Sequence, residues 1–224
     1  EKTGRYRRGI GVARGFHTSG TGGPKPGEVI DYSSATVKIN EDGTVDVMTP
    51  VVDHGGGTGE AAVKVASEVL QIPYEKVELS QVDTRTTGYD VCTHATRGVY
   101  CGCGAVHNVA LQVKEKLLEY AARMLDENPG YLDLAYDPES GETLVHPKGY
   151  KQKNITVAKV AKMAQIYSWG TIAATGSLRQ KNCPPCFVAH YLEVEVDTWT
   201  GIIRVPRAVL LSDSGTPVNP DMVA

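Results

Sequence analysis

The stretch EDGTVDVMTPVVDHGGGTGEAAVKVASEVL, residues 41–70, decides the fold because it joins a turn, a strand, a glycine loop and a helix. Its Glu-Asp-Gly turn separates two segments rich in β-branched residues, 29–40 and 44–52, which predicts an antiparallel hairpin. Apolar residues recur at helical spacing over 58–70, and Thr58 is suited to be the N-cap residue of that helix. The sequence thus predicts a hairpin that leads through three glycines directly into a helix.

The glycine loop at residues 55–57 has the features of an anion-binding site. The first turn of a helix leaves backbone N–H groups unpaired, its dipole favours negative charge, and glycines let a phosphate approach the backbone. A tight strand-to-helix turn without a ligand is the alternative. A P-loop is excluded because no Gly-Lys-Ser/Thr follows, and the dinucleotide fingerprint fails because Glu60 and Ala62 stand where it requires glycine.

A second polar loop, residues 83–97, precedes the longest helical pattern, residues 99–125. Long polar loops in compact domains are more often functional than structural, so this loop is a candidate for a second part of the same anionic ligand. Arg97 suits a phosphate but equally suits a carboxylate. His94 is open to two interpretations, a hydrogen-bonded structural histidine or a ligand-binding group.

The rest of the chain alternates short strands, loops and a helix. Hairpins combined with long helices predict an α+β fold, in which β-hairpins form a mixed sheet packed by the two main helices. The remaining predicted elements are a loop over 14–27, a strand over 77–82, a small, polar, partly β insertion over 131–153, a helix over 155–164 capped by Thr156, a loop around 170–186, and a second hairpin over 190–196 and 202–212.

The composition is that of an ordinary globular protein and limits the choice of partners. Apolar residues make up 41% and charged residues 22%, and the formal net charge of −3 gives no reason to expect nucleic acid or an anionic membrane. The sequence contains no run of 18 apolar residues, so it predicts no membrane span. Residues 1–4 lack the apolar core of a signal peptide. We therefore expect a cytoplasmic protein.

The five cysteines allow a metal site, but their setting favours thiols. An odd number of cysteines and the absence of an export signal fit a reducing compartment. Cys101 and Cys103 fall at a helix start and point to different sides, and the two prolines between Cys183 and Cys186 restrict a zinc knuckle. Small buried or loop thiols are the preferred interpretation, with a metal site as the alternative.

Taken in order along the chain, these motifs resemble one family. They are similar to the second molybdopterin-binding region of the xanthine dehydrogenase/aldehyde oxidase family, in the version found in bacterial hydroxylases and 4-hydroxybenzoyl-CoA reductases. The matching segments are residues 9–13, 32–35, 41–45, 55–57, 70–73, 83–84, 93–97, 100–105, 193–201 and 213–220.

The resemblance implies that both loops contact a molybdopterin, through backbone more than through side chains. The cofactor would carry molybdenum, with its cytosine dinucleotide form as one option, and no side chain of this chain would ligate the metal. Gly56 stands where the family has glutamine, Cys103 where it has glycine, and Thr96 where it has serine. The implied cofactor-binding residues are Gly55, Gly56, Gly57, Thr93, His94, Ala95, Thr96 and Arg97.

The resemblance also implies a function, as part of a molybdenum hydroxylase that is inactive when this chain is alone. Residues 1–224 would be a partial molybdopterin-binding region with family segments missing at both ends, the catalytic glutamate among them. Its partners would be the remaining molybdopterin-binding segments and iron–sulfur and FAD modules. The alternatives are a natural short subunit that completes its site with a partner chain, a non-catalytic binding module for a phosphorylated ligand, and a dinucleotide-dependent enzyme, which the failed fingerprint disfavours.

Overall fold

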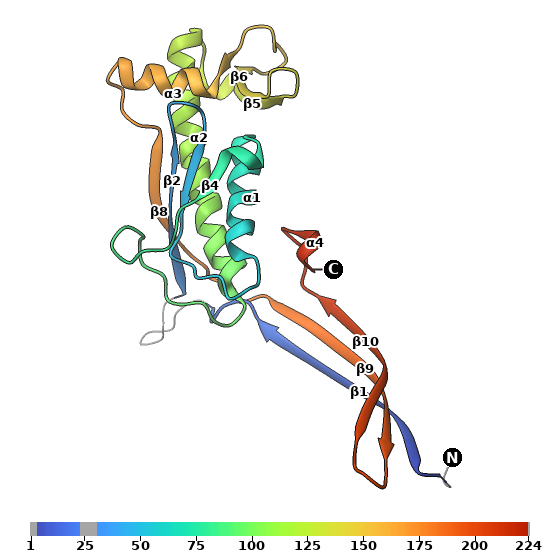
Figure 1. The fold of residues 1–224 in the computed structure, drawn as a ribbon. Coiled ribbons are helices and arrows are strands. Elements are labelled where there is room, and N and C mark those ends of the chain that lie inside the picture. Colours follow the sequence, from blue (N-terminus) through green and yellow to red (C-terminus); the bar gives the residue numbers. More distant parts are fainter. Residues whose placement is uncertain (1–3, 23–30, 224) are drawn as a thin grey trace.

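The computed structural model describes residues 4–22 and 31–223, and its strands form three separate sheets (Figure 1). Residues 23–30 lie outside the described part, and with them part of the loop predicted over 14–27 and the first two residues of the strand predicted over 29–40. The main body contains a four-stranded sheet of order β4-β3-β2-β8. Its strands are β2 (Tyr32–Ile39), β3 (Val45–Met48), β4 (Val77–Leu79) and β8 (Ala173–Arg179).

The predicted first hairpin is confirmed in this sheet. β2 and β3 pair antiparallel, with Thr36 opposite Met48 and Ile39 opposite Val45, whereas β4 joins β3 in parallel. The sheet is therefore mixed, as predicted. The prediction of a loop around 170–186 is wrong over β8. The pairing of β8 with β2 joins segments more than a hundred residues apart and leaves no local turn signal.

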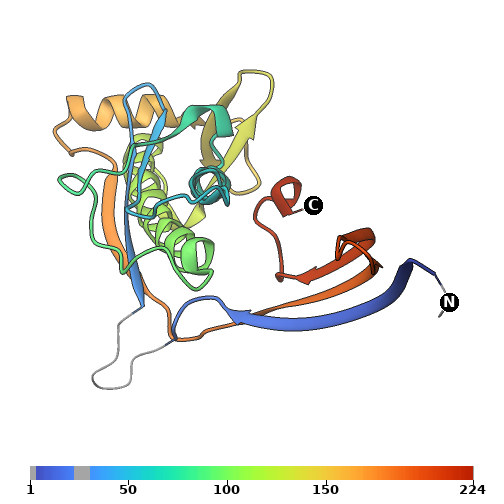
Figure 2. The same cartoon turned by 60° about the horizontal axis from the view of Figure 1, so that its bottom comes forward.

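Two long helices cover one face of the sheet, α1 (Thr58–Leu70) and α2 (Gly104–Leu125) (Figures 1 and 2). Both confirm the predicted helices, although the first residues of the second are a π-helical segment, η2 (Gly98–Cys103). Their apolar stripes meet the sheet in one core, because side chains three and four residues apart share a helix face. Its most buried members are Val37, Val45, Val47, Ala66, Leu70, Val106, Val113 and Leu117.

The smaller elements extend this core. The predicted short helix is confirmed as α3 (Val157–Ile166), and the hydroxyl oxygen of Thr156 accepts the N–H of Lys159, as expected of its cap. The region 131–153 holds β5 (Leu132–Asp137) and β6 (Glu142–Pro147), which form a second sheet with β7 (Ile155–Thr156). Apolar side chains of this small sheet join the main core. The short helical turns are η1 (Tyr74–Lys76), η3 (Pro129–Tyr131) and α4 (Pro220–Val223).

The third sheet, which we call the arm, extends away from the body (Figures 1 and 2) and consists of β1 (Tyr6–Thr18), β9 (Pro185–Asp197) and β10 (Ile203–Asp213). β9 and β10 confirm the second predicted hairpin. The expectation that both hairpins would lie under the helices is wrong, because β1 and β10 of the arm are exposed along almost their whole length.

The prediction of a loop over 14–27 is also wrong where that range overlaps β1. Residues 14–18 continue β1, and Thr18 pairs with Pro185 of β9. The partner strand lies almost at the other end of the chain, so local turn and glycine signals do not reveal this pairing.

At the tip of the arm, Arg5 pairs with Asp197 and Arg8 with Glu195. In the described part of the chain, no helix combines the length and the apolarity that a bilayer crossing needs.

Two leucines of α2 test the assignment of the core. Leu117 is 0% exposed and Leu111 is 40% exposed on the same helix. Leu117→Ala should lower the free energy of unfolding by about 2–5 kcal/mol, because it removes buried apolar atoms and leaves a cavity. The matched change Leu111→Ala should cost no more than about 0.5 kcal/mol. Equal losses for the two variants in urea denaturation would contradict this placement of the helix.

Candidate functional site

Residues 49–54 connect the end of β3 to the glycine loop, which enters α1 at Gly57. Gly57 is the N-cap residue, with a φ of 72°, a left-handed conformation that glycine adopts without strain. The prediction of Thr58 as N-cap is therefore wrong by one residue, because the backbone turns at Gly57 and Thr58 is already helical. The side chain of Thr58 packs instead against the start of η2. A Cβ added to Gly98 would lie only 3.1 Å from the Thr58 hydroxyl oxygen.

Asp53 binds the backbone N–H groups of this loop with its carboxylate. One oxygen accepts from Gly55 at 2.8 Å and from Gly57 at 3.2 Å, and the other accepts from Gly59 at 3.2 Å. Burial by itself would raise the pKa of Asp53, but the backbone N–H groups outweigh it and hold the pKa below its usual value. The N–H groups that suggested an external anion thus already bind a carboxylate of the chain itself.

The second loop holds two consecutive residues in a strained backbone conformation. Ala95 and Thr96 have φ values of 46° and 50°, the left-handed region that non-glycine residues seldom adopt. Contacts to the end of β1 hold them there: the carbonyl oxygen of Ala95 accepts the N–H of Gly20 at 2.7 Å, and the Thr96 hydroxyl donates to the Thr18 carbonyl oxygen at 2.7 Å. Such strain persists only where surrounding contacts fix it, and it clusters at functional sites.

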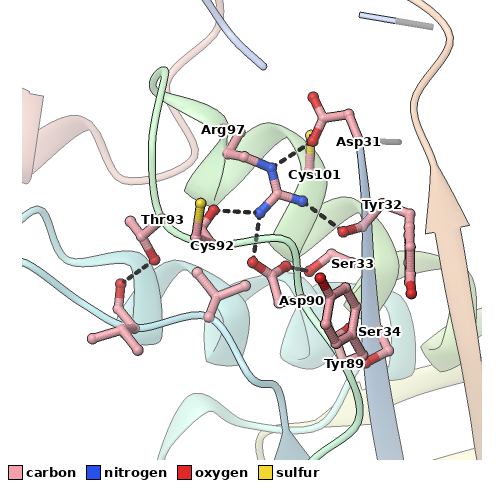
Figure 3. A network of polar contacts seen from close by, with 12 residues as sticks. Asp31, Tyr32, Ser33, Ser34, Tyr89, Asp90, Cys92, Thr93, Arg97 and Cys101 are labelled. Carbon is pink, nitrogen blue, oxygen red and sulfur yellow. Dashed lines mark hydrogen bonds and ion pairs between the residues drawn. The ribbon is translucent and has the colours of Figure 1, made fainter. Parts of the chain in front are cut away.

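Arg97 ends this loop, and its side chain is fully buried. Figure 3 shows its guanidinium among Asp31, Asp90, Cys92 and Tyr32. It donates to the carboxylate of Asp31 at 2.5 Å and to that of Asp90 at 2.6 Å. It also donates to the carbonyl oxygens of Cys92 and Tyr32, each at 2.7 Å. Of the two partners left open for Arg97, carboxylates are the ones that it binds. These contacts hold the second loop in place, and a role of Arg97 in binding the cofactor stays a prediction.

One guanidinium carries a single positive charge and cannot balance two carboxylates. Neutral donors therefore also bind Asp31 and Asp90. Ser33 donates its hydroxyl to Asp90, and the backbone N–H of Thr21 donates to Asp31 at 2.8 Å. Burial alone would raise the pKa of Asp31, but the Thr21 N–H and the Arg97 guanidinium outweigh it, so the pKa lies below its usual value. The cluster therefore favours the ionised form of Asp31.

The two loops meet at one cavity of about 640 Å³. Gly56 and Gly57 line it from the first loop and Thr96 from the second, while Gly55, Thr93, His94 and Ala95 flank these residues in the chain. The Thr93 hydroxyl donates to the Val52 carbonyl oxygen at 3.0 Å and so links the loops directly. None of the described residues that line the cavity is Asp, Glu, Lys or Arg. The other lining residues are Ser19, Ala61, Val65, Val99, Tyr100, Cys103, Gly104, His107, 184–186, 214–219, Met222 and Val223.

The cavity fits a flat, uncharged heterocycle better than a phosphate. A Cβ built on Gly55 or Gly56 would meet nothing within 4 Å, so there is open space over the loop. Among the described residues, the one buried side-chain oxygen or nitrogen without a hydrogen-bond partner is Oδ1 of Asn219, a residue of the cavity wall. An unpaired buried acceptor is costly, and a ring N–H is the kind of group that pairs with it. The residues present thus suit the ring system of a pterin.

Sequence reasoning missed two contributors to this site, Asp53 and the segment 214–219. An Asp two residues before a glycine turn is a recognisable signal, because its side chain readily accepts N–H groups a short way along the chain. Segment 214–219 carried no such local signal. It reaches the cavity only because the end of β10 returns it to α1, where the Asn219 amide donates to Glu60 at 3.1 Å.

The cysteines lie in the described structure as free thiols. Burial raises the pKa of Cys101 and of Cys103 to about 12, so both are protonated at neutral pH. No group of three or more His, Cys, Asp or Glu residues within 4–22 and 31–223 is arranged to hold a metal ion.

Arg97→Gln should lower the free energy of unfolding by about 3–5 kcal/mol, because it leaves two buried carboxylates without their cation. The control is Arg85→Gln, an exposed arginine of the same loop, which should cost no more than about 0.5 kcal/mol. Urea denaturation measures both. A loss for Arg97→Gln as small as that of the control would show that the cluster contributes little to stability.

The stabilising contribution of Asp31 should disappear in acid. Its folded-state pKa is lowered, so the contribution is present above the unfolded carboxyl pKa of about 3.9 and is lost as the pH falls through the folded pKa. The difference in unfolding free energy between the wild type and Asp31→Asn should be largest near neutral pH and shrink below about pH 4. A difference that stays constant on acidification, measured by denaturant titration at each pH, would refute this.

Comparison with known proteins agrees with this geometry. The family model described as "Molybdopterin cofactor-binding domain" matches residues 1–224. A probable hypoxanthine oxidase, XdhD, of Escherichia coli K12 is 30% identical over 194 residues, which cover 86% of this chain and 20% of that protein. A putative xanthine dehydrogenase molybdenum-binding subunit, XdhA, of the same strain is 27% identical over 221 residues, which cover 97% of this chain and 28% of that protein.

Solved structures show the same fold. Quinoline 2-oxidoreductase from Pseudomonas putida 86 superposes with a TM-score of 0.84 at 26% identity, over 98% of this chain and 28% of that one. Carbon monoxide dehydrogenase from Oligotropha carboxidovorans superposes with a TM-score of 0.82 at 24% identity, over 98% and 27% of the two chains. This chain thus spans between a fifth and three tenths of these four relatives. Because the family model matches all 224 residues, the chain belongs to the molybdopterin cofactor-binding domain family.

Proposed function

We propose that this chain forms one wall of the molybdopterin site of a larger molybdenum hydroxylase of the xanthine dehydrogenase/aldehyde oxidase type. The observation that carries the proposal is the meeting of two loops, distant in sequence, on one cavity of about 640 Å³ with an uncharged lining. When bound, a molybdopterin supplies a dithiolene that holds the molybdenum at which substrate is oxidised, and the protein supplies binding and orientation.

The residues would hold the cofactor mainly through backbone. Gly55 and Gly56 offer open space for the flat face of a ring, since a Cβ at either would meet nothing within 4 Å, whereas Gly57 lies against the Met222 side chain. Thr96 also lines the cavity, and its hydroxyl donates to the carbonyl oxygen of Thr18, which holds the second loop in place. Arg97 acts through the loop conformation. The base that moves the substrate proton is proposed to lie outside this chain, because the described residues of the cavity wall include no carboxylate.

The partners and the finer identity of the cofactor are part of the same proposal. XdhA is named a molybdenum-binding subunit, which by analogy suggests iron–sulfur and FAD modules on other chains or domains. A cytosine dinucleotide form of the cofactor and a cytoplasmic location complete the hypothesis. A binding module for a phosphorylated ligand, the main alternative, is disfavoured because the described lining residues include no Lys or Arg to pair with phosphate.

Filling the cavity tests the proposal. Val99 lines the cavity and is 38% exposed, whereas Val82 is 37% exposed and is not among the lining residues. In the full natural polypeptide, Val99→Trp should reduce the molybdenum and pterin content of the purified protein several-fold without lowering its Tm. Val82→Trp is the matched control and should retain both. Equal retention in the two variants, or a wild type that never acquires a pterin, would refute the proposed function.

Gly56→Gln should tighten retention of the cofactor. The change restores the amide that the family resemblance predicts at this place, and the Cβ meets nothing within 4 Å. One added hydrogen bond is worth about 1 kcal/mol, which corresponds to roughly fivefold slower loss of pterin during dialysis. Gly56→Ala is the control, because it adds the Cβ without the amide. If glutamine and alanine give the same rate of loss, the amide makes no contact with the cofactor.

A further inference from the structure

The carboxylate of Asp53 lies where the glycine loop would otherwise receive an anionic group. We infer that Asp53 is a specificity-determining residue: it occupies the loop's N–H groups, so the loop accepts an uncharged part of its ligand and excludes phosphate. The inference rests on the proposed function, because it concerns which end of a molybdopterin faces the loop. It assigns the neutral ring system to residues 55–57 and places the phosphate end away from them.

The hydrogen bonds of Asp53 leave few donors for a competing anion. Its two oxygens accept the N–H groups of Gly55, Gly57 and Gly59 at 2.8–3.2 Å. These N–H groups belong to the loop and the first turn of α1, the donors that helix N-termini present to phosphates. A phosphate oxygen would have to displace the carboxylate or lie beside it, where two negative charges repel each other.

A second carboxylate reinforces this exclusion. Glu60 lies in the first turn of α1 and compensates the positive end of the helix dipole together with Asp53. The nearest cation on that helix, Lys64, pairs with Glu60 at 3.5 Å. Arg97, the cation at the end of the other loop, is buried between Asp31 and Asp90. The groups that could bind phosphate near the glycine loop are thus paired within the chain.

The lining of the cavity agrees with a neutral ligand group. The described residues around it are apolar, hydroxyl, thiol, imidazole or amide groups, without a formally charged side chain. Phosphate sites in proteins commonly combine backbone N–H groups with Arg or Lys, and the described residues of this wall include neither Arg nor Lys. A ring system stacked over open glycines needs only apolar contact and a few hydrogen bonds, which this wall provides.

Hydrogen–deuterium exchange with inorganic phosphate tests the inference. In the cofactor-free full natural polypeptide, peptides covering 53–60 should exchange slowly, and phosphate should not change their rate. Asp53→Ser should exchange several-fold faster, and phosphate should slow it again by occupying the released N–H groups. Asp53→Asn keeps a side-chain oxygen that accepts N–H groups, so it should fold even if the serine variant does not, with a smaller response to phosphate.

The matched control is Asp83→Asn in the second loop, where Asp83 accepts the N–H of Arg85 at 2.8 Å. It should leave residues 53–60 unaffected. The inference is overturned if phosphate slows exchange at 53–60 in the wild type, or if neither folded Asp53 variant responds to phosphate. These outcomes are separate from the proposed function, which fails on molybdenum and pterin content regardless of how phosphate behaves.

Discussion

The buried guanidinium of Arg97 is the interaction on which the site depends. A charge with 0% exposure must be paired, and Arg97 pairs with Asp31 at the start of the central sheet and with Asp90 in the second loop. The same group binds the carbonyl oxygens of Cys92 and Tyr32. The loop therefore cannot relax from its strained path without uncovering buried charges, and this fixes one wall of the cavity.

The glycine loop is fixed by the same means, a carboxylate of the chain itself. Asp53 holds the N–H groups of the loop as Asp31 and Asp90 hold the guanidinium of Arg97. In both loops the groups that suggest an external anion are satisfied internally. The described lining of the cavity consists of backbone, apolar, hydroxyl, thiol, imidazole and amide groups, which suits the ring of the cofactor that this domain family binds.

The arm contributes to the site through its base, although most of it lies far from the body (Figure 2). β9 begins at Pro185 and β10 ends at Asp213, and the residues next to these points, 184–186 and 214–219, line the cavity. Pairing of β1 with β9 also places Thr18 next to the second loop. The part of the cavity wall formed by residues 184–186 and 214–219 thus depends on strand pairing between the two ends of the chain.

The sequence by itself determined the first hairpin, the helices α1, α2 and α3 and the second hairpin, because each depends on periodicity or turn chemistry within a few neighbouring residues. It also located both loops of the site. Only the tertiary structure decided that β1 is a strand, that Arg97 binds carboxylates and that segment 214–219 closes the cavity. The reason is physical: a buried ion pair or a strand pair needs a partner distant in the chain, and local patterns carry no information about that partner.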